Sequence, residues 1–429
     1  MSTKVKLTLL NFLEFAVWGG YLTSMGTYLA RVGMAGQIGW FYSVQGFVSL
    51  CMPALMGIVA DRWVEAQRLL SLCHLLSGAF MLALCLYGFQ AGDAVQFAPL
   101  FTLYTLSVAF FMPTIALSYS VAYSALDQAG LDTVRAFPPI RVFGTVGFIV
   151  SMWVVDLGGM QSTSLQFGWS GLLGIVMAAY AITMPHCPTS GGAHRSLADT
   201  LGLKAFALFR DYRMALFFIF SMLLGVCLQI TNSFANLFIT SFGHISQFSD
   251  TFGVRHANIL ISLSQVSETL CILLIPCFLK RFGIKRVMLL AMLAWALRYL
   301  FFAIGNPGSG VWWFVLSMIV YGIAFDFFHI SGSLFLGKVT SIDIRSSAQG
   351  LFMMMTNGFG ATVGTLSAQQ VVNHYVLDLG AGADPMAVWQ GWTTCWYIFA
   401  GYSLVLAVAF AILFRYKHQP GSEKSVKEV

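Results

Sequence analysis

Five charged side chains interrupt apolar stretches that are long enough to cross a lipid bilayer. They are Glu14, Arg141, Glu268, Arg298 and Asp326. A charge near the bilayer centre costs about 2.5–3.5 kcal/mol on insertion scales. Arg298 lies near the end of its stretch, where a long side chain can reach the membrane surface, so we expect a structural role for it. The other four need water, a partner or a bound solute, and they are candidate functional groups.

Polar and aromatic residues recur beside these charges at helical spacing. Residues three, four or seven positions apart share one face of a helix. Four apolar stretches carry such sets: Arg141, Thr145 and Phe148; Gln229, Asn232 and Asn236; Gln265 and Glu268; Tyr321 and Phe325, followed by Asp326. Amides and carboxylates on several helices predict a wet central cavity. The alternative, that such groups only join helices by hydrogen bonds, stays open for Thr145, Asn236 and Asn357.

The composition excludes a water-soluble globular protein. Lys and Arg number 23 and Asp and Glu 17, so charged residues make up 9% of 429, and 58% of the chain is apolar. A soluble domain has roughly 25% charged residues, and a spanning helix needs about 20 apolar residues. The sequence therefore predicts an all-α integral membrane protein with twelve transmembrane helices. They are expected near 6–29, 37–60, 67–90, 97–122, 137–157, 165–185, 214–240, 255–279, 285–304, 311–337, 343–371 and 391–415.

The positive charges predict the orientation of these helices. If the first one starts inside, the inner loops and the two tails hold 19 of the 23 Lys and Arg residues, and the outer loops hold only Arg31 and Arg255. Loops rich in Lys and Arg face the cytoplasm. We therefore expect both termini in the cytoplasm.

The longest polar segment lies near the middle of the chain and divides it. We predict an N-terminal six-helix bundle over 1–185, a cytoplasmic linker over 186–213, a C-terminal six-helix bundle over 214–415 and a cytoplasmic tail over 416–429. Basic inner loops follow the second and the eighth predicted helices, as in transporters built from two pseudo-equivalent repeats.

Several motifs resemble known transporter families. Residues 57–62, Gly-Ile-Val-Ala-Asp-Arg, resemble the loop 2–3 signature of the major facilitator superfamily, from which the chain departs after Arg62. Five more segments resemble, in the same order, the bacterial nucleoside:proton symporters of that superfamily. They are 137–148, 228–232, 264–269, 321–328 and 348–350. The resemblance implies a proton-coupled nucleoside importer that works by alternating access in the bacterial inner membrane.

A nucleoside offers a flat base and a ribose with hydroxyls, so its pocket needs an aromatic wall and several amides or carboxylates. With the substrate class taken from the resemblance, we predict that nine residues bind it: Arg141, Thr145, Phe148, Gln229, Asn232, Gln265, Glu268, Tyr321 and Phe325. Asp326 is the expected main coupling acid, and Glu268 is expected to bind substrate and also to titrate. Glu14 is either a second proton site or merely an acid that faces the cavity. His329 is not included in the predicted site.

The sequence offers little support for other classes of function. It contains no Walker A motif, no metal-ligand spacing of His or Cys and no lysine at the centre of a span. We therefore expect no metal and no cofactor, with the proton as coupling ion. The expected partners are a nucleoside and the lipid bilayer, without nucleic acid, and the protein is expected to be a monomer. A symporter for another polyhydroxylated solute and a membrane-embedded enzyme remain as alternatives.

Overall fold

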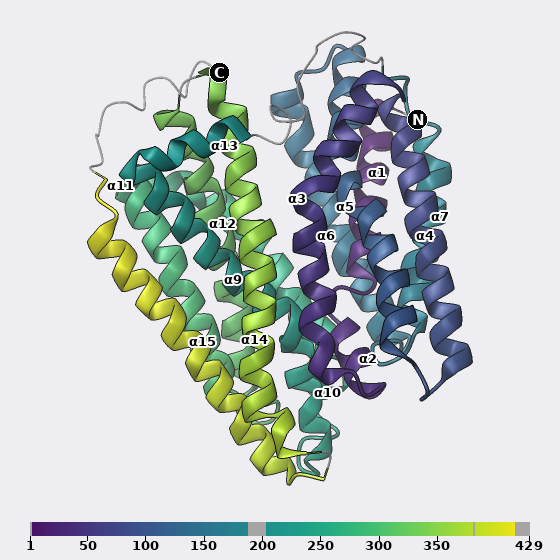
Figure 1. Ribbon diagram of the computed structural model, residues 1–429, viewed down its shortest axis with the longest axis vertical. Helices are drawn as coiled ribbons and strands as arrows, with labels where there is room; N and C mark the ends of the chain where they lie inside the picture. Colours follow the sequence, from purple (N-terminus) through teal and green to yellow (C-terminus); the bar gives the residue numbers. More distant parts are fainter. Residues whose placement is uncertain (1, 188–202, 341, 381, 417–429) are drawn as a thin grey trace.

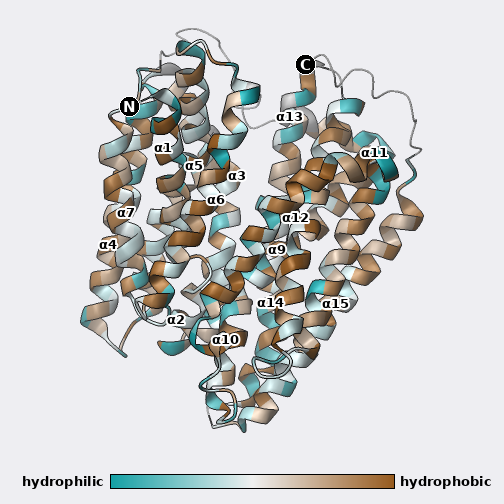
Figure 2. Ribbon diagram, turned by 180° about the vertical axis from the view of Figure 1, so that it is seen from behind, coloured by the Kyte–Doolittle hydropathy of each residue, from teal (hydrophilic) through white to brown (hydrophobic). Residues whose placement is uncertain are grey.

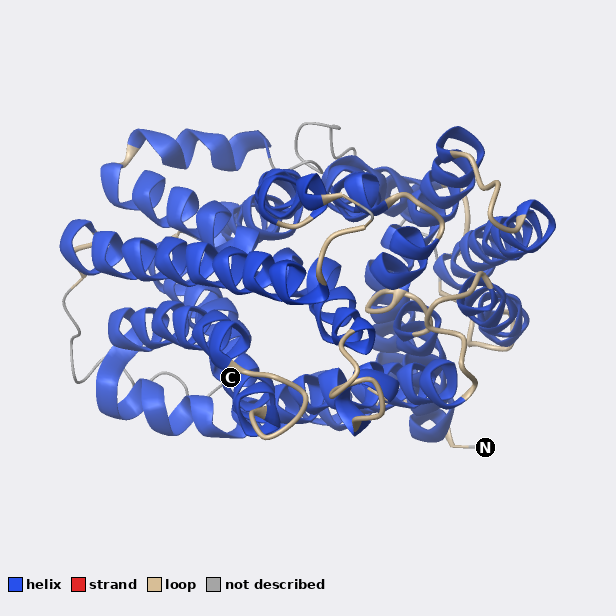
Figure 3. Ribbon diagram, turned by 90° about the horizontal axis from the view of Figure 1, so that it is seen from below, coloured by secondary structure: helices blue, strands red, loops and turns tan. Residues whose placement is uncertain are grey.

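The computed structural model describes residues 2–187, 203–340, 342–380 and 382–416, and within them all regular structure is helical (Figure 3). The first half contains α1 (Thr3–Gly19), α2 (Met25–Arg31), α3 (Ile38–Arg62), α4 (Ala66–Ala91), α5 (Phe97–Gln128), α6 (Thr133–Leu157) and α7 (Leu165–Ala181). The second half contains α9 (Tyr212–Ser241), α10 (Phe252–Arg255), α11 (Ala257–Ile304), α12 (Val311–Val339), α13 (Ile342–Met353), a π-helical segment (Met354–Gly360), α14 (Ala361–Tyr375) and α15 (Pro385–Leu413).

The helices form two groups that lie side by side. Figure 1 shows α1–α7, in purple and blue, on one side and α9–α15, in teal, green and yellow, on the other, with the start of α1 and the end of α15 toward the same end of the molecule. We call these groups the N-bundle and the C-bundle, and we call the end opposite the termini, where α2 and α10 lie, the distal end. The predicted boundaries at 186–213 stay a prediction, since residues 188–202 of that linker, like most of the tail 416–429, lie outside the described residues.

The helices have the length and composition of membrane spans. Eight of them are long and apolar enough to cross a bilayer. Figure 2 shows hydrophobic residues along the middle of most helices and hydrophilic residues toward their ends. The chain is thus a multi-pass membrane protein. The count of twelve spans stays a prediction. It requires α11 to be divided at Gly283, where φ is 75° and the helix bends. It also requires α1 with α2, and α13 with the π-helical segment and α14, each to be counted as one span.

Three predicted helices differ from the structure. The stretch 6–29 is interrupted between Gly19 and Met25, where Ser24 donates a hydrogen bond to Gln166 instead of continuing a helix. The stretch 343–371 is divided by the π-helical segment.

The third difference concerns the helix that carries Arg141. It begins at Thr133, before the two prolines, and the Ala136 N–H already donates to the Asp132 carbonyl at 2.8 Å. The predicted range 137–157 places Pro138 in the first turn and Arg141 about one turn inside. Arg141 instead lies eight residues after Thr133, which is slightly more than two turns.

Hydrogen bonds join the two bundles at the distal end. The side chain of Asp156, at the end of α6, is buried against the start of α11. Its Oδ2 accepts from the backbone N–H groups of Asn258 at 3.0 Å and Ile259 at 3.3 Å, and its Oδ1 lies 2.6 Å from Nδ1 of His256. Asp156 thus caps, from the N-bundle, the first turn of a C-bundle helix. The side chain of Asn258 in turn accepts from Thr23 at 3.0 Å.

Two further contacts close the same end. Gln369 on α14 accepts from the Gly39 N–H at 2.7 Å and donates to the Ala35 carbonyl at 3.0 Å. Asn236 on α9 accepts from Thr27 at 2.5 Å and donates to Gln161 at 3.0 Å. The bundles are therefore held together at the distal end, and their helices diverge toward the end that carries the termini (Figure 1).

The start of the linker is fixed to the N-bundle. Gln67 accepts from the Cys187 N–H at 3.0 Å, and Nδ1 of His186 lies 3.2 Å from the Glu65 carboxylate. The hydrogen bond from His186, with Arg68 nearby, lowers the pKa of Glu65. This cluster lies just after residues 57–62 in sequence, at the end of the molecule opposite the distal end.

Candidate substrate-binding site

Arg141 is held within the N-bundle by aromatic residues. Its Nε donates to the Tyr119 hydroxyl at 2.6 Å, and its guanidinium carbon lies 3.9 Å from the ring centroid of Phe15. A guanidinium over an aromatic face is attracted by the ring quadrupole. These contacts fix the side chain without neutralising its charge, which remains available to an acid or to a ligand.

The acids that face this charge come from the C-bundle. Glu268 on α11 and Asp326 on α12 interact electrostatically with each other and with Arg141. Asp326 is 5% exposed, and its Oδ2 has no hydrogen-bond partner among the described residues. The fold thus places one cation and two acids from opposite bundles near one another, although Arg141 lies more than 120 residues from either acid in sequence.

Two aromatic rings stand beside the acids on α12. Tyr321 and Phe325 are parallel, with centroids 5.8 Å apart and an interplanar angle of 2°. The Tyr321 hydroxyl interacts with the side chain of Gln265. The predicted aromatic wall and one of the predicted amides therefore do lie together.

The amides on α9 have two different surroundings. The Asn232 amide donates to Oε1 of its neighbour Gln229 at 3.4 Å, and Asn232 is half-buried. Asn236 is fully engaged in the distal contacts, so the interpretation that it joins helices fits the structure. Gln229 and Asn232 remain candidate ligands.

The two remaining predicted residues lie on α6. Phe148 is 7% exposed and meets Trp18 edge to face, with centroids 6.3 Å apart. Its ring packs largely within the N-bundle, so only a small part of it is free to meet a base. Thr145 is half-buried on the same helix.

We expected the Arg298 side chain to reach the membrane surface, but the structure places it inside the C-bundle. It is 2% exposed, donates to the Ser317 carbonyl at 2.7 Å and lies 4.6 Å from the ring centroid of Tyr321. These contacts fit the expected structural role. Arg298 has this role inside the C-bundle, where its guanidinium lies against the ring of Tyr321, a residue of the predicted aromatic wall.

A small cavity opens beside Phe325 within the C-bundle. Its lining includes Trp295, His329, Thr356 and Asn357, none of which we predicted as ligands. His329 Nε2 is buried without a partner among the described residues. The sequence offered one clue, a polar Thr-Asn pair inside an apolar stretch. The π-helical turn that aims this pair inward is not readable from hydrophobic periodicity.

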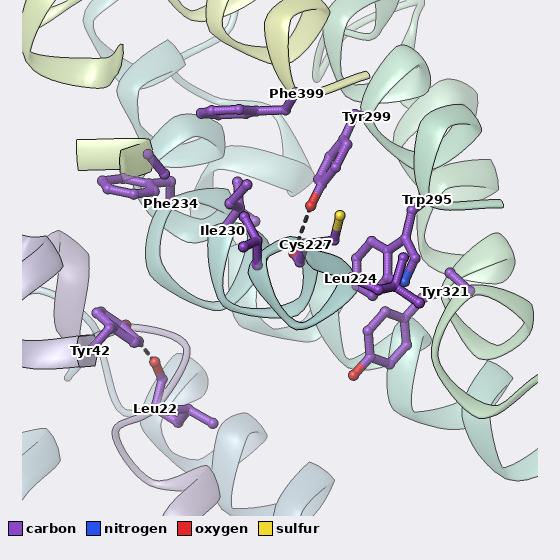
Figure 4. Close-up of a cluster of buried hydrophobic side chains, with 14 of the residues drawn as sticks. Leu22, Tyr42, Leu224, Cys227, Ile230, Phe234, Trp295, Tyr299, Tyr321 and Phe399 are labelled. Atoms are coloured by element: carbon purple, nitrogen blue, oxygen red, sulfur yellow. Dashed lines mark hydrogen bonds between the residues drawn. The ribbon is translucent and has the colours of Figure 1, made fainter. Parts of the chain in front are cut away.

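A packed aromatic core holds α9, α11 and α12 in place around the cavity. Figure 4 shows Tyr299, whose hydroxyl donates to the Cys227 carbonyl at 2.6 Å, next to Trp295, which lies between Tyr299 and Tyr321. The Trp295 and Tyr321 rings meet edge to face at 5.9 Å. Because interiors pack to high density, these rings define the position of the wall.

Comparison with known proteins decides the family. A family model described as nucleoside H⁺ symporter matches residues 1–419. The chain belongs to the nucleoside H⁺ symporter family. It is 46% identical to the xanthosine permease of Escherichia coli (strain K12), over 98% of both chains, and 46% identical to the nucleoside permease NupG of the same organism, over 97% of both. The crystal structure of NupG matches with a TM-score of 0.87 at 45% identity, covering 97% of this chain and all of that one.

These matches establish the fold and the class of protein. The fold is of the major facilitator type, and the protein is a nucleoside transporter rather than an enzyme. They do not test individual residues, so the nine predicted substrate contacts and the two coupling acids remain predictions.

The cavity-facing interpretation of Glu14 is wrong. Its side chain has no exposed surface and lies inside the N-bundle.

Proposed function

We propose that this protein imports nucleosides together with protons across the bacterial inner membrane by alternating access. The observation that carries the proposal is the placement of Arg141 in one bundle opposite Glu268 and Asp326 in the other. A proton that neutralises one acid changes the attraction between the bundles, so proton binding is coupled to their relative motion. No metal or cofactor takes part, and the transporter acts as a monomer with both termini in the cytoplasm.

The distal contacts indicate which state the structure represents. With cytoplasmic termini the distal end faces outward, so the hydrogen bonds of Asp156, Asn236 and Gln369 close the outer side, and the conformation is inward-facing. Substrate would then lie between the Gln265 and Glu268 side of the C-bundle and Arg141 of the N-bundle. The name of one relative favours xanthosine and that of another favours nucleosides in general.

Uptake into proteoliposomes tests this function. Labelled xanthosine, uridine and adenosine should accumulate when the external medium is more acidic, and a protonophore should abolish accumulation. The solute should be recovered unchanged, which separates transport from enzymatic conversion. Accumulation of a sugar in preference to every nucleoside would contradict the proposed substrate class.

Gln265→Ala should weaken nucleoside binding. An unpaired polar group in a desolvated complex costs about 1–3 kcal/mol, which is roughly a 5-fold to 150-fold rise in Kd. Calorimetry on purified protein measures it, and Gln96→Ala, at an exposed position before α5, is the matched control. Wild-type affinity in a folded Gln265→Ala protein would place the pocket elsewhere.

Asp156→Asn should open the distal end. The variant replaces a charged acceptor for two N–H groups of α11 with a neutral amide oxygen. A hydrogen bond to a charged group is worth about 1 kcal/mol more than one between neutral groups, so the outward-open population should rise roughly 5-fold. Spin labels at Asp93 and Ser246, in distal loops of the two bundles, would report the longer distance. Asp378→Asn is the control, because Asp378 pairs with His374 of its own bundle. Unchanged distances in Asp156→Asn would show that this cap does not hold the closed state.

A further inference from the structure

A buried acid in the N-bundle takes no part in the proposed site. Glu14 on α1 and His74 on α4 have no exposed side-chain surface, and Nε2 of His74 lies 2.8 Å from Oε2 of Glu14. The hydroxyl oxygen of Thr114, on α5, lies 2.6 Å from Oε1 of Glu14. Three helices thus enclose one carboxyl group and supply a neighbour for each of its oxygens.

The hydrogens available around Thr114 indicate the state of this acid. The Thr114 oxygen also lies 2.6 Å from the Phe111 carbonyl oxygen, and both distances are typical of O–H···O bonds. A hydroxyl has one hydrogen and can donate to only one of these two acceptors. If Glu14 carries a proton on Oε1, it donates to Thr114, and Thr114 donates to Phe111. A hydrogen then lies in each of the two O···O contacts of Thr114. If Glu14 is ionised, one of these two contacts has no hydrogen in it.

His74 supports the same assignment. Its Nδ1 is buried without a hydrogen-bond partner among the described residues. A protonated imidazole carries hydrogens on both nitrogens, so it would bury an unsatisfied N–H, which is costly. A neutral imidazole with its hydrogen on Nε2 donates to Oε2 of Glu14 and leaves only a bare acceptor at Nδ1. The proton of the pair therefore belongs on Glu14.

We propose that Glu14 is a second proton-binding group of this transporter, which holds a proton between Thr114 and His74 in the N-bundle while Asp326 serves the C-bundle. We argue the proton site from the hydrogen-bond geometry around Glu14, and only its role in transport rests on the proposed function.

The charged and titratable neighbours suggest what this proton does. Arg141 on α6 lies against Phe15, the residue next to Glu14, and is bonded to Tyr119 on α5. On α4 the titratable neighbours are His74 and the buried Cys73, and α7 carries no charged residue over Leu165–Ala181. Loss of the proton would create a buried carboxylate near Arg141. That carboxylate would compete with Glu268 and Asp326 for the guanidinium, so the proton on Glu14 leaves Arg141 available to the C-bundle.

Infrared spectroscopy on the purified protein tests the site without any substrate. A neutral carboxylic acid has a C=O stretching band separate from that of a carboxylate. We expect Glu14→Gln, whose amide imitates the neutral acid, to remove one carboxylic-acid band at neutral pH that Asp326→Asn leaves in place. Thr114→Val, which removes the acceptor of the proposed proton, should shift the same band. An unchanged carboxylic-acid region in Glu14→Gln, or an unshifted band in Thr114→Val, would overturn the assignment.

Nucleoside exchange tests the role. Glu14→Gln, whose amide imitates the proton-bearing acid, should keep at least half of the wild-type exchange rate, because Arg141 stays available to the C-bundle. A rate below half of the wild-type value in folded Glu14→Gln protein would exclude the role in transport. Since the infrared measurement needs no nucleoside, it remains decisive even if the transported solute is different.

Discussion

Asp326→Asn is expected to abolish proton-driven accumulation of nucleoside while substrate binding and exchange persist. The carboxyl is almost fully buried, and its Oδ2 finds no partner among the described residues, which suits an acid that carries a proton for part of the cycle. One coupled charge gains about 2.3 kcal/mol per 100 mV, which supports accumulation of roughly 50-fold. Since the amide imitates the neutral acid, the variant should equilibrate nucleoside to a ratio near one.

Proteoliposomes separate these outcomes. Uphill uptake under a pH gradient measures coupling, and exchange of labelled for unlabelled nucleoside measures binding and conformational change. Glu268→Gln is the matched comparison, and we expect it to lower affinity because Glu268 is chiefly a ligand. Wild-type accumulation by Asp326→Asn would move the coupling role to Glu268 or Glu14. Loss of binding as well would indicate that Asp326 only holds the helices together.

Arg141→Gln should lose both tight binding and coupling. The arginine is the cation that faces Glu268 and Asp326 across the interface, and hydrogen bonds that involve a charged group are worth about 1.5–3 kcal/mol. The Kd for nucleoside should therefore rise roughly 10-fold to 150-fold, and uphill uptake should fall to the level of empty vesicles. Calorimetry and uptake measure the two effects separately.

Arg141→Lys distinguishes charge from geometry. Lysine keeps the positive charge but cannot reproduce the Nε donation to Tyr119 or the flat contact with Phe15. We expect proton coupling to survive in part and affinity to fall. Coupled uptake by Arg141→Gln at the wild-type level would show that this charge is not needed in the cycle.

Hydrophobic composition alone determined the class of this protein. A chain with 9% charged residues cannot cover a water-soluble globule, and backbone groups in lipid must bond within helices, so a helical membrane protein was the expected fold. Helical spacing was also sufficient to place Tyr321 and Phe325 on one face, where their rings are parallel. Local periodicity carries this information because each side chain's direction follows from its position along a helix.

The tertiary structure decided which charges are free and which are satisfied. Glu14 and Asp326 look alike in sequence, each a single acid in an apolar stretch, yet one is enclosed by His74 and Thr114 while the other has an unpartnered oxygen. Arg141 and Arg298 also differ, since Arg141 faces Glu268 and Asp326 of the other bundle, whereas Arg298 bonds to Ser317 within its own bundle. The cap that Asp156 provides for α11 and the π-helical turn at Asn357 were likewise not predicted. Each of these features depends on partners from distant parts of the chain. The hydrophobic pattern of one helix does not specify which helix packs against it.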